Sequence, residues 1–92
     1  MAIGDTVLDF GATPTQLAEV VVTAQAAILA TAAVEAFLMA EASADHNAVE
    51  HRIVPMTLRC GDIVPGVGFT IFARSEWALT GEFKVRWVWA AV

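Results

Sequence analysis

The stretch that decides the fold lies near the end of the chain and reads Glu82-Phe83-Lys84-Val85-Arg86-Trp87-Val88-Trp89. Large apolar and polar side chains alternate along most of it, and period-two alternation places successive side chains on opposite faces of a β-strand. One face of this strand therefore carries Phe83, Val85, Trp87 and Trp89. Because such a face must be covered by a second layer, the stretch predicts a layered β-protein.

Two further strands are predicted upstream. Residues 67–74 place on one face Val67, Phe69, Ile71 and Ala73. Residues 51–60 also place apolar side chains on one face of a strand, in a row that begins at Arg52 and continues with Val54, Met56, Leu58 and Cys60. Turn-forming pairs separate these strands, since Gly61-Asp62 tolerates positive φ and Pro65-Gly66 suits a type II turn. We expect three antiparallel strands in one sheet, packed against a second sheet from the first half of the chain.

The first half allows two interpretations. Residues 7–10 and 19–23 have strand-like composition. Residues 24–44 are rich in alanine, which favours a helix, but apolar side chains also alternate at Val34, Ala36, Leu38 and Ala40, which favours a strand. The predicted fold class is an all-β antiparallel sandwich forming one domain over residues 1–92. The alternative is an α+β fold with a helix within 24–44.

The composition requires more burial than one small core provides. The 92 residues are 58% hydrophobic and 16% charged, whereas an ordinary soluble domain is about 45–50% apolar and about 25% charged. A chain of this length buries only about 60–65% of its unfolded surface. We therefore expect contacts with other chains. Membrane insertion is not expected, because the longest uncharged stretch, residues 20–34, is shorter than the roughly 20 residues of a spanning helix.

The charges argue against nucleic acid as a partner. The net charge is −5, and the basic residues are dispersed at Arg52, Arg59, Arg74, Lys84 and Arg86. Binding to a phosphate backbone needs clustered cations. Asp5 and Asp9 also replace the basic segment that opens a signal peptide. The single cysteine, Cys60, forms no internal disulfide, which fits assembly in a reducing cytoplasm.

Side chains that could carry chemistry gather only in the run Asp45-His46-Asn47-Ala48-Val49-Glu50-His51. Imidazole and carboxylate groups together form zinc sites. The spacing of five, however, places His46 and His51 on different sides of a helix and on opposite faces of a strand. We interpret the run as a solvated loop and Cys60 as a buried thiol. The sequence predicts no catalytic, cofactor-binding or metal site.

Trp77 falls in a loop predicted at residues 75–80. Aromatic side chains exposed on loops often contact partners, so Trp77 is the first candidate for such a contact. The other candidates are large apolar residues that the strand pattern leaves outside the core. The predicted interface residues are Phe37, Met39, Phe72, Trp77 and Val88.

Several segments resemble small structural proteins encoded by tailed bacteriophages and prophages. The resemblance covers nearly the whole chain, through Leu8–Ala12, Val22–Gln25, Asp45–His51, Cys60–Ala73, Leu79–Gly81 and Val85–Trp89. Its most specific element is Gly68-Phe69-Thr70-Ile71, followed by the closing Trp87-Val88-Trp89.

The resemblance implies a β-sandwich without enzymatic activity, and it favours strands in the alanine-rich segment. It further implies a virion structural protein that is assembled in the host cytoplasm and located either on the capsid or in the tail or fibre apparatus. Phage decoration proteins are often trimeric, so we expect a homotrimer that contacts other virion proteins. The alternative is a receptor- or glycan-binding module of the virion that uses Trp77.

Overall fold

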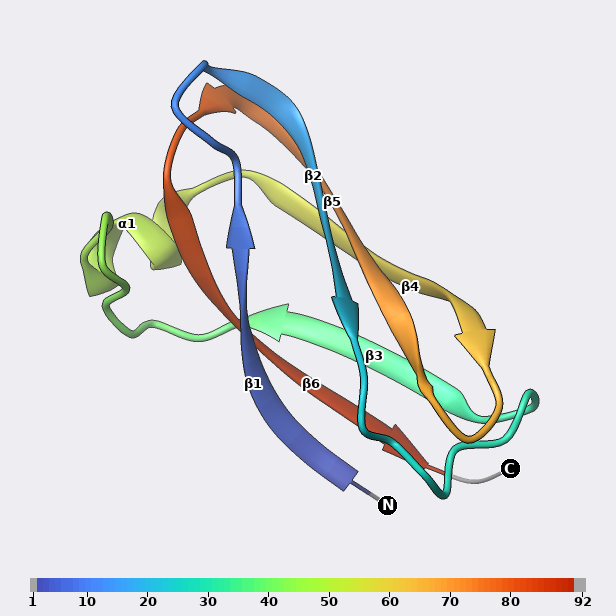
Figure 1. The fold of residues 1–92 in the computed structure, drawn as a ribbon. Coiled ribbons are helices and arrows are strands. Elements are labelled where there is room, and N and C mark those ends of the chain that lie inside the picture. Colours follow the sequence, from blue (N-terminus) through green and yellow to red (C-terminus); the bar gives the residue numbers. More distant parts are fainter. Residues whose placement is uncertain (1, 91–92) are drawn as a thin grey trace.

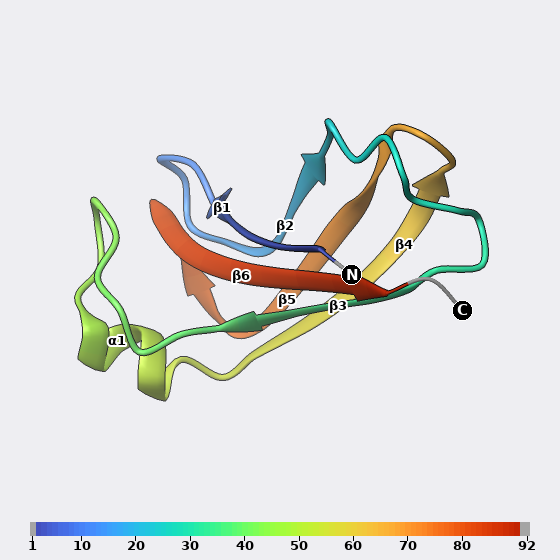
Figure 2. The same ribbon diagram turned by 90° about the horizontal axis from the view of Figure 1, so that it is seen from below.

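The chain folds into a sandwich of two three-stranded antiparallel sheets, in a computed structural model that describes residues 2–90 (Figures 1 and 2). Sheet A has the order β1-β6-β3, with the bounds Ala2–Asp9, Glu82–Ala90 and Ala33–Leu38. Sheet B has the order β2-β5-β4, with the bounds Thr15–Val22, Gly68–Leu79 and Met56–Val64. The predicted all-β class is confirmed. Within residues 2–90 no helix is long and apolar enough to cross a membrane.

The core lies between the central strands of the two sheets. The inward row predicted for β6 is confirmed, because all its members are buried: Phe83, Val85, Trp87 and Trp89. β5 contributes the predicted row Phe69, Ile71 and Ala73. The rings of Phe69 and Trp87 meet edge to face across the sandwich, with centroids 5.5 Å apart. Val67 was predicted in the same row but lies exposed in the turn that precedes β5.

The prediction that the last three strands form one sheet is wrong. β4 and β5 do pair through the predicted turn, in which Gly66 has a φ of +77°. The connection from β5 to β6 instead crosses from sheet B to sheet A. At this corner the Gly81 N–H donates to the Gly11 carbonyl and the Gly81 carbonyl accepts from the Phe10 N–H, both at 2.9 Å. These bonds hold the corner at the end of β1, and β6 pairs with β1 and β3.

The alternative with a helix within 24–44 is also wrong. Residues 23–32 form a loop, and β3 follows with alternate side chains facing the core. The loop folds over the β4–β5 turn, where the Gln25 N–H donates to the Val67 carbonyl and the Gly66 N–H donates to the Ile28 carbonyl. Ile28 is fully buried beneath it. Pairing with β6 and burial of Ile28 therefore override the helical propensity of the alanines.

Two predicted boundaries differ from the structure. The strand predicted to start at His51 starts at Met56, because the short helix α1 (Ala48–Ile53) precedes it. The loop predicted at residues 75–80 is wrong as well. β5 continues to Leu79, so Trp77 lies on a strand. Met1, Ala91 and Val92 lie outside the described residues.

Gly68 provides a test of the contact between β5 and the end of β2. A Cβ at this position would overlap the carbonyl of Val22, which is backbone and cannot rotate away. We expect Gly68→Ala to lower the free energy of unfolding by about 2 kcal/mol or more, as overpacking does. In the control Gly61→Ala the added Cβ meets only Phe72, at 3.7 Å. Chemical denaturation of both variants checks this, and equal losses would contradict it.

Candidate functional site

His51 fastens α1 to sheet A. Its side chain is buried, with 3% of the residue exposed. Nδ1 lies 2.9 Å from the Asn47 carbonyl, and Nε2 lies 2.9 Å from the backbone nitrogen of Lys84. Since the carbonyl can only accept and the backbone N–H can only donate, the ring is a neutral tautomer protonated at Nδ1. His51 therefore joins α1 and its N-cap residue to the start of β6.

His46 closes the same end of the sandwich with a different set of hydrogen-bond partners. Its ring stacks on Phe83 with centroids 3.9 Å apart. Nδ1 lies 2.9 Å from a Glu50 carboxylate oxygen and Nε2 lies 2.6 Å from the Thr80 carbonyl. Both partners are acceptors, so the geometry suits an imidazolium that donates from both nitrogens. Burial opposes this charge, but the bonds to Glu50 and Thr80 outweigh it and raise the pKa of His46.

These contacts leave little room for the zinc set considered from the sequence. Each ring nitrogen of His46 and His51 already has a hydrogen-bond partner. Between Ala2 and Ala90 no three His, Cys, Asp or Glu side chains are grouped so that they could hold a metal ion. The interpretation of residues 45–51 as a solvated loop is confirmed for residues 45–47 and wrong for the rest, because α1 begins at Ala48 and His51 is buried.

Cys60 lines a groove between β3 and β4 and is half-buried, whereas the sequence predicted a buried thiol. Desolvation raises the pKa of its thiol, and the negative charge of Glu35 adds to this effect. A thiol with a raised pKa is a poor nucleophile at neutral pH. The side chain therefore contributes packing.

Trp77 lies beside α1 at the end of β5, and half of the residue is exposed. Next to it is a small hollow of about 180 Å³ with a mainly apolar lining. Val49 and Ile53 on α1 are exposed as well. We name this region the Trp77 surface; it consists of Val49, Ile53, Trp77 and the hollow lined by His46, Glu50, Val54, Leu79 and Phe83.

The other predicted interface residues lie on different surfaces. Phe37 and Val88 face outward from sheet A, and Met39 follows β3. Phe72 faces outward from sheet B. Phe37 and Phe72 are each 36% exposed, whereas Met39 and Val88 are half-buried. The structure therefore does not combine the predicted residues into a single patch.

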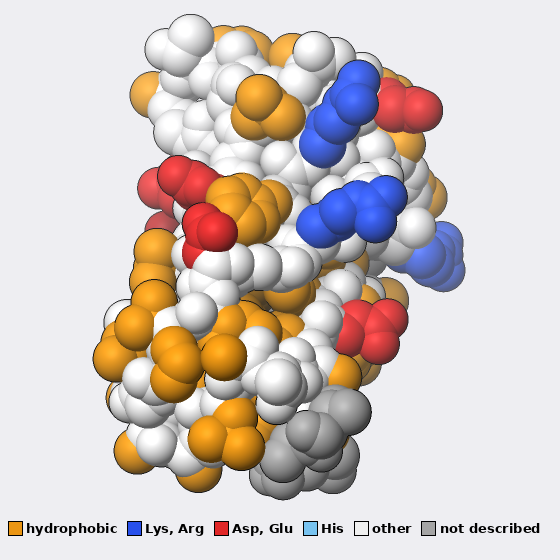
Figure 3. All heavy atoms as spheres, turned by 90° about the vertical axis from the view of Figure 1, so that its right-hand side faces the viewer, with side chains coloured by type: hydrophobic (Ala, Val, Ile, Leu, Met, Phe, Trp, Pro, Cys, Tyr) orange, Lys and Arg blue, Asp and Glu red, His pale blue; other side chains and the backbone are white. Residues whose placement is uncertain are grey.

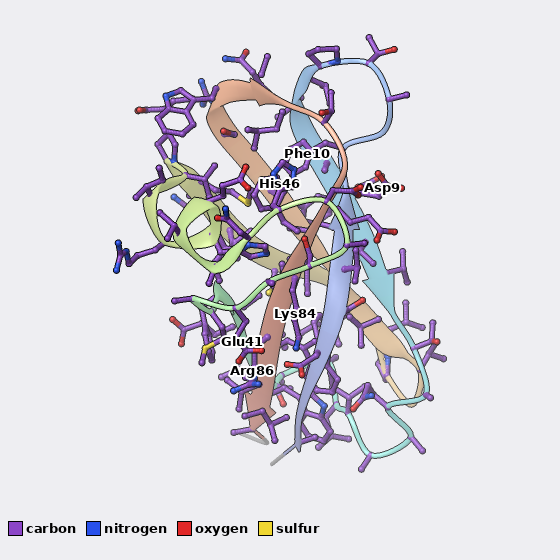
Figure 4. All side chains as sticks on the ribbon, turned by 90° about the vertical axis from the view of Figure 1, so that its left-hand side faces the viewer. Asp9, Phe10, Glu41, His46, Lys84 and Arg86 are labelled. Atoms are coloured by element: carbon purple, nitrogen blue, oxygen red, sulfur yellow. The ribbon has the colours of Figure 1, made fainter. Side chains whose placement is uncertain are left out.

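Ion pairs occupy the outer face of sheet A. Lys84 Nζ lies 2.8 Å from Glu41 Oε2, and Arg86 Nε lies 2.8 Å from Asp5 Oδ1. Figure 4 shows Glu41, Lys84 and Arg86 close together below His46. Hydrogen bonds to these cations lower the pKa of both carboxyl groups. Because all four groups are well solvated, they favour solubility more than stability.

The sequence interpretation missed an apolar end of the sandwich. Residues 20–34 and 63–73 carry no charge, and the structure brings their loops together. Apolar side chains gather over the lower half of the side shown in Figure 3, where these loops lie. We name this region the apolar end; its exposed residues include Val21, Leu29, Val64 and Val67. The signal in the sequence was the lack of charge in these two separate stretches, which could have indicated a shared apolar surface.

The sequence interpretation also missed α1, although its signal is present. Asn47 is the N-cap, and its side chain accepts from the Glu50 N–H at 2.8 Å. The Glu50 carboxylate accepts in return from the Asn47 N–H at 2.9 Å. This reciprocal pair is a capping box, which is visible in a sequence as a capping residue followed three positions later by Glu.

Replacement of His51 tests its role as a fastener. We expect His51→Leu to lower the free energy of unfolding by about 2–3 kcal/mol, because it removes the acceptor of the Lys84 N–H at a site where His51 itself is buried. The control Arg52→Leu changes an exposed neighbour on the same helix and should alter stability by less than about 0.5 kcal/mol. Urea denaturation compares the two, and a small loss in His51→Leu would contradict the assignment.

The hydrogen bonds of His46 predict that the free energy of unfolding depends on pH. Its pKa is raised in the folded state, so its charge stabilises the fold fully below about pH 6.5, and this contribution is lost as the pH rises through the folded-state pKa. The difference in unfolding free energy between the wild type and His46→Gln should therefore be larger near pH 5.5 than near pH 8.5. Glu50, whose pKa His46 lowers, is ionised at both pH values, and groups that His46 does not contact cancel in this difference. A constant or growing difference would contradict the prediction.

The described residues thus offer solvated ion pairs, an apolar end and the Trp77 surface. Residues 2–90 contain no group of side chains arranged for metal binding. No family model, curated protein or solved structure matches this chain. The geometry itself is therefore the starting point for a functional proposal.

Proposed function

We propose that this protein is a non-enzymatic structural protein of a bacteriophage virion, which associates with itself and binds neighbouring capsid or tail proteins. The observation that carries the proposal is the amount of large apolar side chain left on the surface of so small a sandwich. Trp77 is half exposed, and Leu17, Val21 and Ile3 are more than 60% exposed. Exposed apolar patches of this kind mark sites of protein association.

The sequence resemblance to phage structural proteins supports the same function. So does the site chemistry, because both histidines are held in structural hydrogen bonds and the Cys60 thiol has a raised pKa. Catalysis would need a nucleophile, a base and an oxyanion site converging on one cavity. The residues that line the Trp77 surface suit contact with an apolar side chain of a neighbouring protein instead.

The second candidate is a receptor- or glycan-binding module of the virion, which one observation favours. A half-exposed Trp77 beside a shallow hollow is the kind of platform on which a sugar ring stacks. In this case the same surface would face the host cell and not a neighbouring virion protein.

Trp77→Ala separates the two functions in particles produced by the phage or prophage that encodes the chain. We expect incorporation into particles to fall about tenfold or more, since truncating a buried aromatic anchor typically costs about 2 kcal/mol or more of binding. The matched control is Leu17→Ala, a comparably exposed apolar residue on sheet B. Quantitative mass spectrometry of purified particles gives the copy number, and thermal melting verifies the fold.

The structural and the receptor-binding functions predict different outcomes for Trp77→Ala. Normal incorporation with lost adsorption to host cells would favour receptor binding. Absence of the wild-type protein from purified particles would overturn the virion proposal in both forms.

A further inference from the structure

The edge strands of the sandwich are not equally protected against pairing with another strand. Each sheet has three strands, so β1 and β3 are the edges of sheet A, and β2 and β4 are the edges of sheet B. Irregular register interrupts β2 between Thr15 and Leu17 and β4 between Gly61 and Val64. Such bulges discourage further pairing. β1 carries two outward carboxylates, Asp5 and Asp9.

β3 has no bulge, and a single charged residue is its only protection against further pairing. It pairs with β6 in an unbroken register from Ala33 to Leu38. It contains no Pro, Gly, Lys or Arg, and Glu35 is its single charged residue. Its other side has no strand partner within the described chain. A regular, largely apolar edge of this kind is a template for a further strand.

The core is also incomplete on this side. β3 and β4 are the two edges on one side of the sandwich (Figure 2). Their inward side chains, among them Val34, Ala36 and Leu58, are only partly buried, unlike the rows of β5 and β6. Between them runs an open groove of about 550 Å³ that reaches Trp89. Glu35 and Arg59 also line this groove, and an added strand beside β3 would cover the apolar side chains at its rim.

The sequence of β3 is complementary to itself in one antiparallel register. Side chains of paired strands must keep to the same face, so only every second register is allowed. With Glu35 opposite its own copy, two carboxylates would face each other, which is unfavourable. Moving the register by two places Ala36 opposite itself, Glu35 opposite Phe37 of the second copy, and Val34 opposite Leu38 of the second copy. This register uses residues 34–38 of both strands.

No other edge of the chain suits β3 as well. Pairing with β1 would bring Glu35 towards Asp5 or Asp9, which carry the same charge. The bulges lie at the start of β2 and near the end of β4. The regular stretch of β2 carries Glu19, which would repel Glu35, and that of β4 carries Arg59, an outward cation of the kind that protects an edge strand. We propose that two copies of this chain associate through antiparallel pairing of β3 with β3, centred on Ala36. The inference rests on the proposed function in that it identifies the self-association surface, and it predicts a two-fold dimer in place of the trimer implied by the resemblance.

Charge variants at Phe37 test the pairing. Phe37→Glu would place two like-charged pairs across the interface, because each introduced carboxylate would face Glu35 of the other copy, and it should weaken the dimer at least tenfold. Within its own chain residue 37 lies opposite Arg86, so the new carboxylate does not threaten the fold. Phe37→Lys removes the same ring but places a cation opposite Glu35, so its dimer should be at least tenfold tighter than that of Phe37→Glu. The double variant Glu35→Lys with Phe37→Glu should restore association.

A cross-link tests the register. In a Cys60→Ser background, Ala36→Cys places a thiol directly opposite its own copy, where Cβ atoms lie about 4.5–5.5 Å apart, and small adjustments allow a disulfide. Oxidation should give a covalent dimer. Val34→Cys in the same background faces Leu38 of the second copy and should remain uncross-linked.

Sedimentation velocity over a concentration series measures the association of all variants. A wild-type chain that stays monomeric or forms a trimer would overturn the pairing, as would a Phe37→Glu protein that dimerises as tightly as the wild type. A monomer would also remove self-association from the proposed function, whereas the virion location would still stand if the protein is found in particles. A dimer with the predicted charge dependence that is absent from particles would support the pairing and overturn the virion proposal.

Discussion

The packing of β5 against β6 is the contact on which the rest of the structure depends. These strands are consecutive in the chain yet belong to different sheets, because Gly81 turns the chain through a corner that is bonded to the end of β1. Their inward rows face each other across the sandwich, with Phe69 against Trp87. A regular hairpin at this point would place both rows on one sheet and leave them uncovered. The corner therefore places the amphipathic strands β5 and β6 in different sheets, so that their apolar faces form the two halves of the core.

The ends of the sandwich follow from this arrangement. Phe83 begins the inward row of β6 and would be open to solvent at the corner. Phe10 meets it edge to face, and His46 stacks on its other side. His51 supplies the acceptor that the Lys84 N–H needs there. His46 and His51 thus close the end of the apolar core, and each ring nitrogen has a hydrogen-bond partner there. The same packing leaves the hollow beside Trp77.

Much of this fold could be predicted from the sequence, and the errors have physical causes. Alternation identified the buried rows of β5 and β6, because the side-chain period is local information. Sheet membership could not be obtained in this way, since it depends on the bonds between Gly81 and the chain near Gly11, about 70 positions earlier. The strand within the alanine-rich segment likewise depends on its tertiary pairing with β6. The capping box at Asn47 and Glu50 was local and could have been recognised.

Charged side chains are distributed unevenly over the surface, and this distribution determines which apolar regions are available for association. Both basic residues of sheet A are held by Asp5 and Glu41, so the outer face of that sheet keeps a solvated ionic cover. The apolar end has no charge in either of its loops, and β3 has only Glu35. Contacts made through these uncharged regions are driven by apolar burial and are screened little by salt. Such a division, with a charged face kept in water and apolar regions free to associate, suits a small subunit whose folding leaves part of its apolar surface for assembly.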